Sequence, residues 1–265
     1  GTLEVINNDN LDAEIKDGKI VLVEKPVAKI GETEYATLAE AVAAVQEGQT
    51  IQLLNGEIKE GTIKLPATLK NVTFKGAADH ASVLKDMTIM AADGNSFNYE
   101  GLTFDGIYFN NSRISLTGWR NGEETIEDLT ITNCIVKNLY DDTNMAFLHI
   151  NKDASEPVKN LTFTNNVLDG VTGGAKSGIY SVNTGNVIIK GNTFNNIVFR
   201  PALVQLSDCD GIVDNVEISN NVISKTTRLQ VYGTEVDNGD GTYTPTGTDE
   251  LEVKINNNIF KNISG

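Results

Sequence analysis

The chain has 265 residues, 40% of them hydrophobic, and a formal net charge of −15 at pH 7. That length is enough to bury the core of one large domain or two small ones. The negative charge excludes nucleic acid as a partner, because no basic surface is available to displace counterions from phosphates. No apolar run of about 18 residues occurs, so membrane insertion is not expected.

The first residues indicate an excised or processed fragment, and the cysteines are interpreted by their number and spacing. The chain starts with Gly-Thr and shows no charged leader followed by an apolar stretch, so we expect a piece of a longer, multidomain surface protein. Cys134 and Cys209 are the only cysteines, and their spacing fits neither a disulfide framework nor a zinc site. Both are expected to be unpaired structural thiols.

Residues 1–30 form the first predicted unit. Asp17-Gly18 separates two alternating segments in AEIKDGKIVLVEKP, which is a signal for a β-hairpin. Pro26 marks an expected hinge. The unit is either the end of an upstream module or a strand packed on the cap of the next unit, and both alternatives stay open.

Residues 31–265 form the second predicted unit, which begins with a capping helix over 36–47. Thr37 and Glu40 have the spacing of a capping box, and Gly48 is expected to end the helix. One face of the helix is apolar: Leu38, Ala41, Val42 and Val45. A helix in this place covers the core that the first coil of a repeat fold leaves open.

From about residue 50 the chain repeats one short phrase, of which NLTFTNNVLDG (160–170) is a clear copy. Copies start at residues 71, 101, 128, 160, 186, 215 and 252. Their second and fourth positions are apolar, and a period of two predicts a strand with one buried face. The sixth position is Gly or Asn. These are the residue types that best tolerate a positive φ. The seventh position predicts a ladder of stacked side chains, with Cys134 in the same column: Asn166, Asn192, Asn221 and Asn258.

Two more alternating stretches follow in each copy. Three strands per unit, stacked in parallel, predict an all-β fold: a right-handed, single-stranded parallel β-helix of about seven to eight coils with an N-terminal capping α-helix. Leucine-rich repeats and propellers fit the period and the strand number less well. The third stretches are RISLT (113–117), FLHIN (147–151), IYSVN (179–183), LVQLS (203–207) and RLQVY (228–232).

A TLAEAVAAV helix, a GQTIQLLNGEI strand and Asn-cornered coils occur in this order over about residues 33–264. In this the chain resembles the pectin-lyase-like superfamily of right-handed parallel β-helix proteins. The resemblance implies a secreted or cell-surface bacterial protein with a carbohydrate polymer as its partner. It implies no single activity, because the superfamily includes lyases, hydrolases, esterases, phage tailspikes and proteins of unknown role.

The catalytic patterns of that superfamily are incomplete in this chain. Arg200 precedes a proline, as in the lyase segment, but the second arginine of that segment is absent. Gly185 in VNTGN stands where the hydrolase pattern has an aspartate, while Asp141 and Asp142 stand alone. The esterase pattern cannot be assembled. The catalytic residues are therefore unknown, and whether the protein is an enzyme stays open.

Acidic residues follow the third stretch of several coils, including Glu123 and Glu124, and we interpret them as a solvated edge. If a cation such as Ca²⁺ binds there, its expected ligands are Asp208 and Asp210 in SDCDG. No other cofactor is expected. VDNGDGTYT (236–244) lacks the length and the final glutamate of an EF-hand, and instead predicts a tight hairpin inserted between coils.

The outward face of the third stretch is the predicted binding surface. Alternation assigns Tyr180 and Val182 to the inside, and Phe147, Ile179 and Ser181 to the outside. A row of apolar, aromatic and hydrogen-bonding groups suits a sugar chain that lies across coils. The alternative is that this row packs under a loop or against another domain. The expected sugar-binding residues are Arg113, His149, Gln205, Arg228, Tyr232 and, on the neighbouring corner, Trp119, with Ser115 in the same row.

Three functions are compatible with this sequence. The preferred one is a secreted or cell-surface module that binds glycan or forms an adhesin or stalk segment. The alternative is a polysaccharide lyase or glycoside hydrolase that acts on a polysaccharide along the outward face. A purely architectural repeat is the third.

Overall fold

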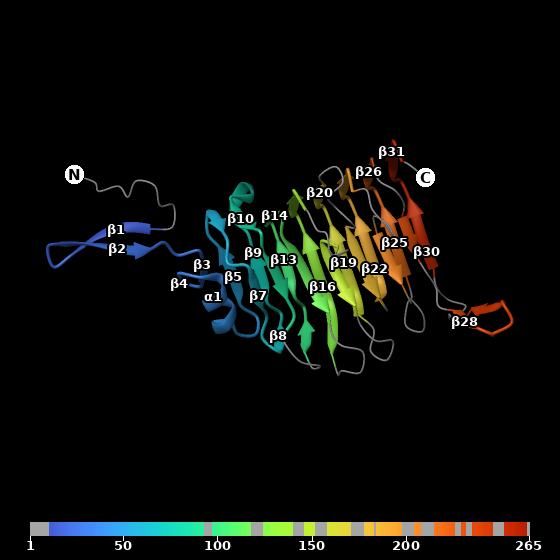
Figure 1. Cartoon of the computed structure of the whole chain (residues 1–265), viewed down its shortest axis with the longest axis horizontal. Helices are drawn as coiled ribbons and strands as arrows, with labels where there is room; N and C mark the ends of the chain where they lie inside the picture. The colour runs from blue at the N-terminus through green and yellow to red at the C-terminus, as the bar shows by residue number, and fades with distance from the viewer. Residues whose placement is uncertain are drawn as a thin grey trace.

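The chain forms a solenoid of short strands, known from a computed structural model. The model describes residues 11–92, 97–117, 124–139, 146–151, 158–170, 178–182, 184–197, 204–207, 215–225, 229–231, 235–245 and 252–263. Three sheets surround one apolar core, and successive coils stack side by side along the molecule (Figure 1). Most coils contribute one strand to each sheet, and the coils of β8 and β12 contribute a second strand to the largest sheet. Equivalent strands of successive coils pair in parallel, so these residues form the predicted parallel β-helix.

The three sheets are named here in the order in which a coil passes through them. Within the described residues the first sheet has twelve strands: β3 (Ala28–Ile30), β4 (Thr33–Tyr35), β5 (Thr50–Leu53), β8 (Thr68–Lys70), β9 (Thr73–Lys75), β12 (Asn98–Glu100), β13 (Thr103–Asp105), β16 (Thr125–Thr132), β19 (Val158–Thr164), β22 (Thr184–Lys190), β25 (Asn215–Ser219) and β30 (Glu252–Asn256). The second has eight: β6 (Gly56–Ile58), β10 (Ser82–Lys85), β14 (Tyr108–Asn110), β17 (Ile135–Lys137), β20 (Val167–Asp169), β23 (Thr193–Asn195), β26 (Val222–Ser224) and β31 (Ile259–Lys261). The third has seven: β7 (Thr62–Lys64), β11 (Thr88–Met90), β15 (Arg113–Thr117), β18 (Leu148–Asn151), β21 (Ile179–Val182), β24 (Val204–Ser207) and β27 (Leu229–Val231).

Apolar side chains from all three sheets fill the core. The second and fourth positions of the repeated phrase are buried, as Leu161 and Phe163 of β19 show. Aromatic rings stack along the solenoid axis, with ring centroids 4.9 Å apart for Phe74 and Phe104 and 6.2 Å apart for Phe163 and Phe194. Each fully buried ring of this kind contributes about 1.5–3 kcal/mol through loss of water contact.

The asparagine ladder lies at the corner between the first and second sheets. The backbone N–H of each ladder residue donates to the side-chain oxygen of the next, at 2.8 to 3.0 Å, in the order Asn166, Asn192, Asn221, Asn258. Cys134 precedes them, as predicted, and its N–H donates to Asn166 Oδ1 at 2.8 Å. Its buried Sγ donates to the Thr132 carbonyl at 3.2 Å. Burial raises the pKa of the Cys134 thiol to about 12, so the thiol stays protonated.

Helix α1 (Leu38–Ala44) covers the N-terminal end of the core and has the predicted capping box. Glu40 N–H donates to Thr37 Oγ1 at 3.1 Å, and Thr37 N–H donates to the Glu40 carboxylate at 3.2 Å. The expected stop at Gly48 is wrong, because the helix ends at Ala44 and Val45 is already extended. Gly48 N–H instead donates to the Lys70 carbonyl at 3.0 Å. This hydrogen bond to the first coil takes the place of a further helical turn. In the described part of the chain, no helix has the length and apolar character needed to cross a membrane.

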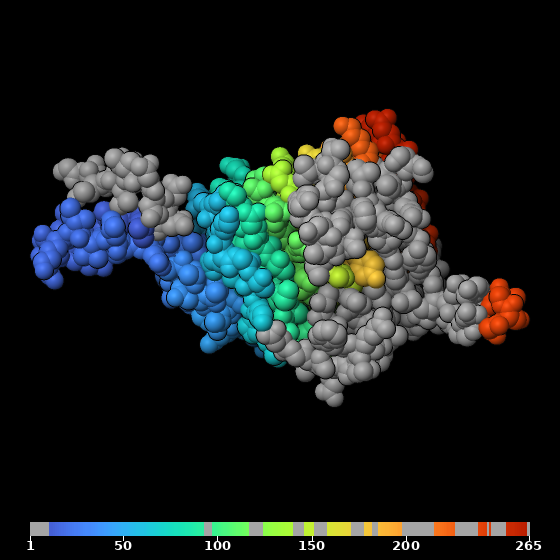
Figure 2. Space-filling view, in the orientation of Figure 1, coloured from blue at the N-terminus to red at the C-terminus, as the bar shows by residue number. Residues whose placement is uncertain are grey.

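Two antiparallel hairpins stand out from the solenoid. Strands β1 (Leu11–Lys16) and β2 (Lys19–Glu24) pair around Asp17 and Gly18, both at positive φ. They extend from the end that carries α1, in blue in Figure 2. Strands β28 (Glu235–Asp237) and β29 (Tyr243–Pro245) form the hairpin predicted within VDNGDGTYT.

Candidate functional site

The outward face of the third sheet brings together several of the predicted binding residues. His149 of β18 pairs in register with Ser115 of β15 on one side and with Tyr180 of β21 on the other. The side chains of His149 and Tyr180 are partly exposed, and their rings meet edge to face with centroids 5.1 Å apart. The row therefore contains an aromatic ring and an imidazole on adjacent coils.

The predicted inward and outward positions of Ile179, Tyr180 and Ser181 in IYSVN are wrong. Ile179 and Ser181 are fully buried, whereas Tyr180 is partly exposed. Pairing decides this, because Leu148 aligns with Ile179 and therefore places Ile179 on the core side of the sheet. Alternation alone does not show which set of positions faces the core, because both the odd and the even positions of this stretch include apolar side chains.

Phe147 is likewise buried, not outward as predicted. It precedes β18 and its ring packs edge to face on two core rings, with centroids 5.0 Å from Phe109 and 6.3 Å from Phe163. Burial of an aromatic side chain of this size in the core stabilises the fold more than its exposure on the surface would.

His149 has the surroundings of a neutral imidazole. Burial, and then the positive charge of Arg113, lower the pKa of His149. Its Nδ1 is buried and has no hydrogen-bond partner among the described residues. Ser115 is also buried, and its Oγ likewise has no partner in the described part of the chain. Buried polar atoms without a hydrogen-bond partner are uncommon in folded proteins, so these two atoms single out the outward row as a candidate site.

Glu124 is a further buried polar residue, although its run of acidic residues suggested a solvated edge. The expectation is wrong for this residue: its side chain is fully buried, and neither carboxylate oxygen has a partner among the described residues. It lies one residue before β16, so it follows the third-sheet strand of its coil. No local pattern in the sequence distinguishes it from Glu123.

The remaining predicted site residues cannot be placed. The backbone of Gln205 pairs with Tyr180 in the outward row, but its side chain lies outside the description. Outside the described residues altogether are Trp119, Arg228 and Tyr232, the cation candidates Asp208 and Asp210, and Glu123, Asp141, Asp142, Arg200 and Cys209. Among the described residues, no three His, Cys, Asp or Glu side chains are grouped so that they could hold a metal ion.

A groove of about 590 Å³ lies elsewhere, at the corner between the first and second sheets. The turn after β9 carries a short 3₁₀ segment, η1 (Ala78–His80). This turn lines one side of the groove, and Asp105, Gly106 and Asn133 of the next two coils also line it. Sequence analysis did not single out this groove.

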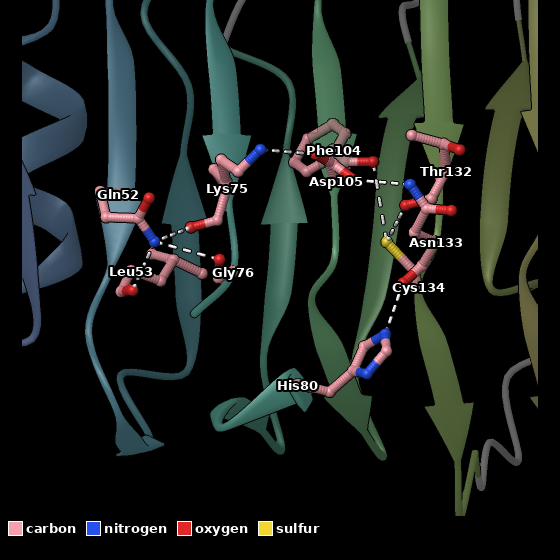
Figure 3. A network of polar contacts seen from close by, with 10 residues as sticks. All are labelled: Gln52, Leu53, Lys75, Gly76, His80, Phe104, Asp105, Thr132, Asn133 and Cys134. Atoms are coloured by element: carbon pink, nitrogen blue, oxygen red, sulfur yellow. Dashed lines mark hydrogen bonds and ion pairs between the residues drawn. The ribbon is translucent and has the colours of Figure 1, made fainter. Parts of the chain in front are cut away.

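A polar network holds the groove together (Figure 3). His80 Nε2 donates to the Asn133 carbonyl at 2.6 Å, across 53 residues of chain. Asn133 Nδ2 donates to Asp105 Oδ1 at 2.9 Å, and Lys75 Nζ lies 3.1 Å from Asp105 Oδ2. Burial acts to raise the pKa of Asp105, but the hydrogen bonds from Asn133 and Lys75 outweigh it and keep the pKa below its usual range. Gln52 Nε2 donates to three backbone carbonyls and fixes the remaining wall.

Comparison with known proteins adds no relative. No protein-family model, curated protein or solved structure matches this chain. Its likeness to other parallel β-helix proteins therefore rests on the repeated phrase and the solenoid fold.

Proposed function

We propose that this protein is a secreted or cell-surface parallel β-helix module of the pectin-lyase-like type that binds glycan on the outward face of its third sheet. The observation that carries the proposal is the contact between the rings of His149 and Tyr180, with Arg113 acting electrostatically on the same histidine. An aromatic ring next to polar groups offers a sugar both a stacking surface and hydrogen bonds.

The scaffold favours such a role. Strand pairing fixes the backbones of β15, β18 and β21 in register, so side chains on adjacent coils keep a constant spacing of about 4.8 Å. A glycan crossing the coils therefore meets groups that are already ordered, which reduces the entropy lost on binding. Arg113 also supplies a local positive charge on a chain whose net charge is −15.

A glycan array tests this proposal. The wild-type protein should retain at least one glycan, and Tyr180→Ala should weaken that binding about tenfold through loss of the stacking surface. Tyr108→Ala is the matched control, because Tyr108 is a partly exposed tyrosine on the second sheet. Trp119→Ala tests the additional stacking residue expected from the sequence. Absence of any retained glycan, or equal losses in Tyr180→Ala and Tyr108→Ala, contradicts the proposal.

A polysaccharide lyase is the second candidate, favoured by the partly exposed imidazole of His149 and its lowered pKa. A neutral imidazole can accept the proton next to the carboxylate of a uronic acid, while the Arg113 guanidinium pairs with that carboxylate. The electrons of the broken C–H bond form a carbon–carbon double bond. The glycosidic oxygen leaves with the electron pair of its C–O bond and takes a proton from water. A glycoside hydrolase is less well supported, because it needs two carboxyl groups and the described outward positions of the third sheet carry none.

Incubation with uronic-acid polymers tests the lyase activity. The unsaturated product is followed by its ultraviolet absorbance, and His149→Ala should abolish the signal while the protein stays folded. If the wild type produces no unsaturated ends from any uronate polymer, this candidate is rejected and the binding role is unaffected.

A further inference from the structure

We propose a second ligand site, in the corner groove between the first and second sheets, that binds a short segment of an uncharged oligosaccharide. The site is separate from the third-sheet face and does not depend on the function proposed for that face. Its walls come from three successive coils, through residues such as Lys75, Asp105 and Asn133.

The turn that forms the groove departs from the other described corners. In the other copies of the phrase, one residue at positive φ is followed directly by the ladder position, as with Asn165 and Asn166. Here the chain runs on through η1, and both Asp79 and His80 adopt positive φ, at 55° and 57°. Two adjacent non-glycine residues in this conformation cost about 1 kcal/mol each or more. Tight corners elsewhere in the chain show that the fold does not need this turn.

The groove lacks a side chain at Gly106, where four later corners carry an asparagine. Gly106 lines the groove at φ 69°, and a Cβ added to it would meet no atom within 4 Å. The equivalent corner position is an asparagine at similar φ in coils further along: Asn133, Asn165, Asn220 and Asn257. Glycine at 106 therefore leaves open a volume that an asparagine side chain would enter, in a backbone conformation that asparagines adopt at the equivalent corners.

The floor beside it is also backbone. A Cβ added to Gly76 would lie 2.0 Å from the Gly106 carbonyl oxygen, so only glycine lets these two coils approach closely at this corner. A ligand in the groove thus rests on peptide groups, while the longer polar side chains form the rim.

The groups on the rim match a hydroxyl-rich, uncharged ligand. Lys75 offers an ammonium donor, Asp79 and Asp105 offer carboxylate acceptors, and Asn133 offers an amide that does both. His80 donates through Nε2 to a carbonyl, which leaves Nδ1 on the other side of the ring. Two carboxylates against one ammonium, on a chain of net charge −15, disfavour an anionic ligand. A volume of about 590 Å³ lies in the range of small-ligand sites.

The decisive variant is Gly106→Asn, which installs at this corner the residue that four later coils carry. Gly191→Asn is the matched control: the same substitution, at the equivalent corner of another coil, where the nearest neighbour is the movable Asn165 side chain. Lys75→Met, which removes a rim donor, is the second variant. The full chain is titrated with neutral gluco-, manno-, xylo- and galacto-oligosaccharides and with an oligogalacturonate, and backbone amide shifts in the NMR spectrum are followed.

At least one neutral oligosaccharide should shift the amides of Gly76 and Gly106. Its affinity should fall about tenfold in Gly106→Asn and less in Lys75→Met, and stay within about twofold in Gly191→Asn. The proposal is overturned if no neutral oligosaccharide shifts these amides, if Gly106→Asn binds like the wild type, or if only the oligogalacturonate binds. Binding that is lost in Tyr180→Ala but kept in Gly106→Asn would support the third-sheet site and reject this one.

Discussion

At the scale of single residues, the inner ladder satisfies every polar atom of a buried amide. Asn192 Nδ2 donates to the Phe163 carbonyl at 2.9 Å and to Asn221 Oδ1 at 3.0 Å. Its own Oδ1 accepts from both the N–H and the Nδ2 of Asn166, at 2.8 and 3.1 Å. Loss of such a side chain leaves several buried partners unsatisfied at once, which is the expensive case for a hydrogen-bond network.

We therefore expect Asn192→Ala to lower the free energy of unfolding by about 3–5 kcal/mol. Asn165→Gly is the control, because Asn165 is exposed and glycine keeps its positive φ, so the cost should be about 1 kcal/mol or less. Urea unfolding of the two variants measures both values. Equal losses in the two variants would show that the ladder amides do not carry the stability assigned to them.

Outside the core, aspartates begin further rows of corner side chains. Asn160 Nδ2 donates to Asp128 Oδ1 at 2.7 Å, and Asn186 Nδ2 donates in turn to Asn160 Oδ1 at 3.1 Å. Asp86 accepts from Asn111 in the same way. The first side chain of such a row only accepts a hydrogen bond within the row. A carboxylate can therefore take this position in place of an amide. The hydrogen bond from Asn111, together with Lys59, lowers the pKa of Asp86 below its ordinary range.

The pKa of His149 predicts a loss of stability in mild acid. Burial, and then Arg113, lower this pKa below the ordinary value of 6.5 in the folded state. Between the two pKa values the unfolded chain binds a proton that the folded chain does not, so the free energy of unfolding falls as pH drops below about 6.5. Thermal unfolding from about pH 7.5 to pH 5 should show a smaller loss in His149→Gln than in the wild type. Identical pH profiles would contradict the assignment.

At the scale of elements, the capping helix shows what a local pattern can and cannot predict. The capping box of Thr37 and Glu40 is readable because its members are three residues apart. A second cap of the same helix cannot be predicted from a local pattern, because its residues are more than twenty positions apart. The Glu60 carboxylate accepts from Leu38 N–H at 2.7 Å and from Ala39 N–H at 3.0 Å. A carboxylate in this position also interacts favourably with the helix dipole.

Glu60→Ala should therefore destabilise the protein by about 1–3 kcal/mol, since two N–H groups lose a charged acceptor. Glu57→Ala is the control, because Glu57 makes an exposed ion pair with Lys85 at 2.9 Å, and its loss should cost less than the loss of Glu60. Both values come from thermal or urea unfolding. A larger loss in Glu57→Ala would mean that the helix N-terminus does not depend on Glu60.

At the scale of the whole molecule, the repeated phrase makes the fold predictable, whereas the sites depend on contacts between coils. Period-two apolar positions and corner asparagines predict strands and corners for each copy separately, and stacking the copies yields the solenoid. Whether the Tyr180 side chain points outward depends on the register between β18 and β21, and local alternation does not determine that register. The corner groove needs His80 to reach Asn133 two coils away, and no phrase in the sequence encodes that contact.

Stacking also limits how far a local change spreads, because each coil pairs with its immediate neighbours. Asn192 bonds to the coils that carry Asn166 and Asn221, so Asn192→Ala should loosen those coils and leave distant ones protected. Hydrogen exchange followed by mass spectrometry should show faster exchange in β20, β23 and β26, with β6 and β10 unchanged under native conditions. Uniform acceleration over all these strands would indicate that the solenoid opens as a single cooperative unit, and the nearest-neighbour description would then be wrong.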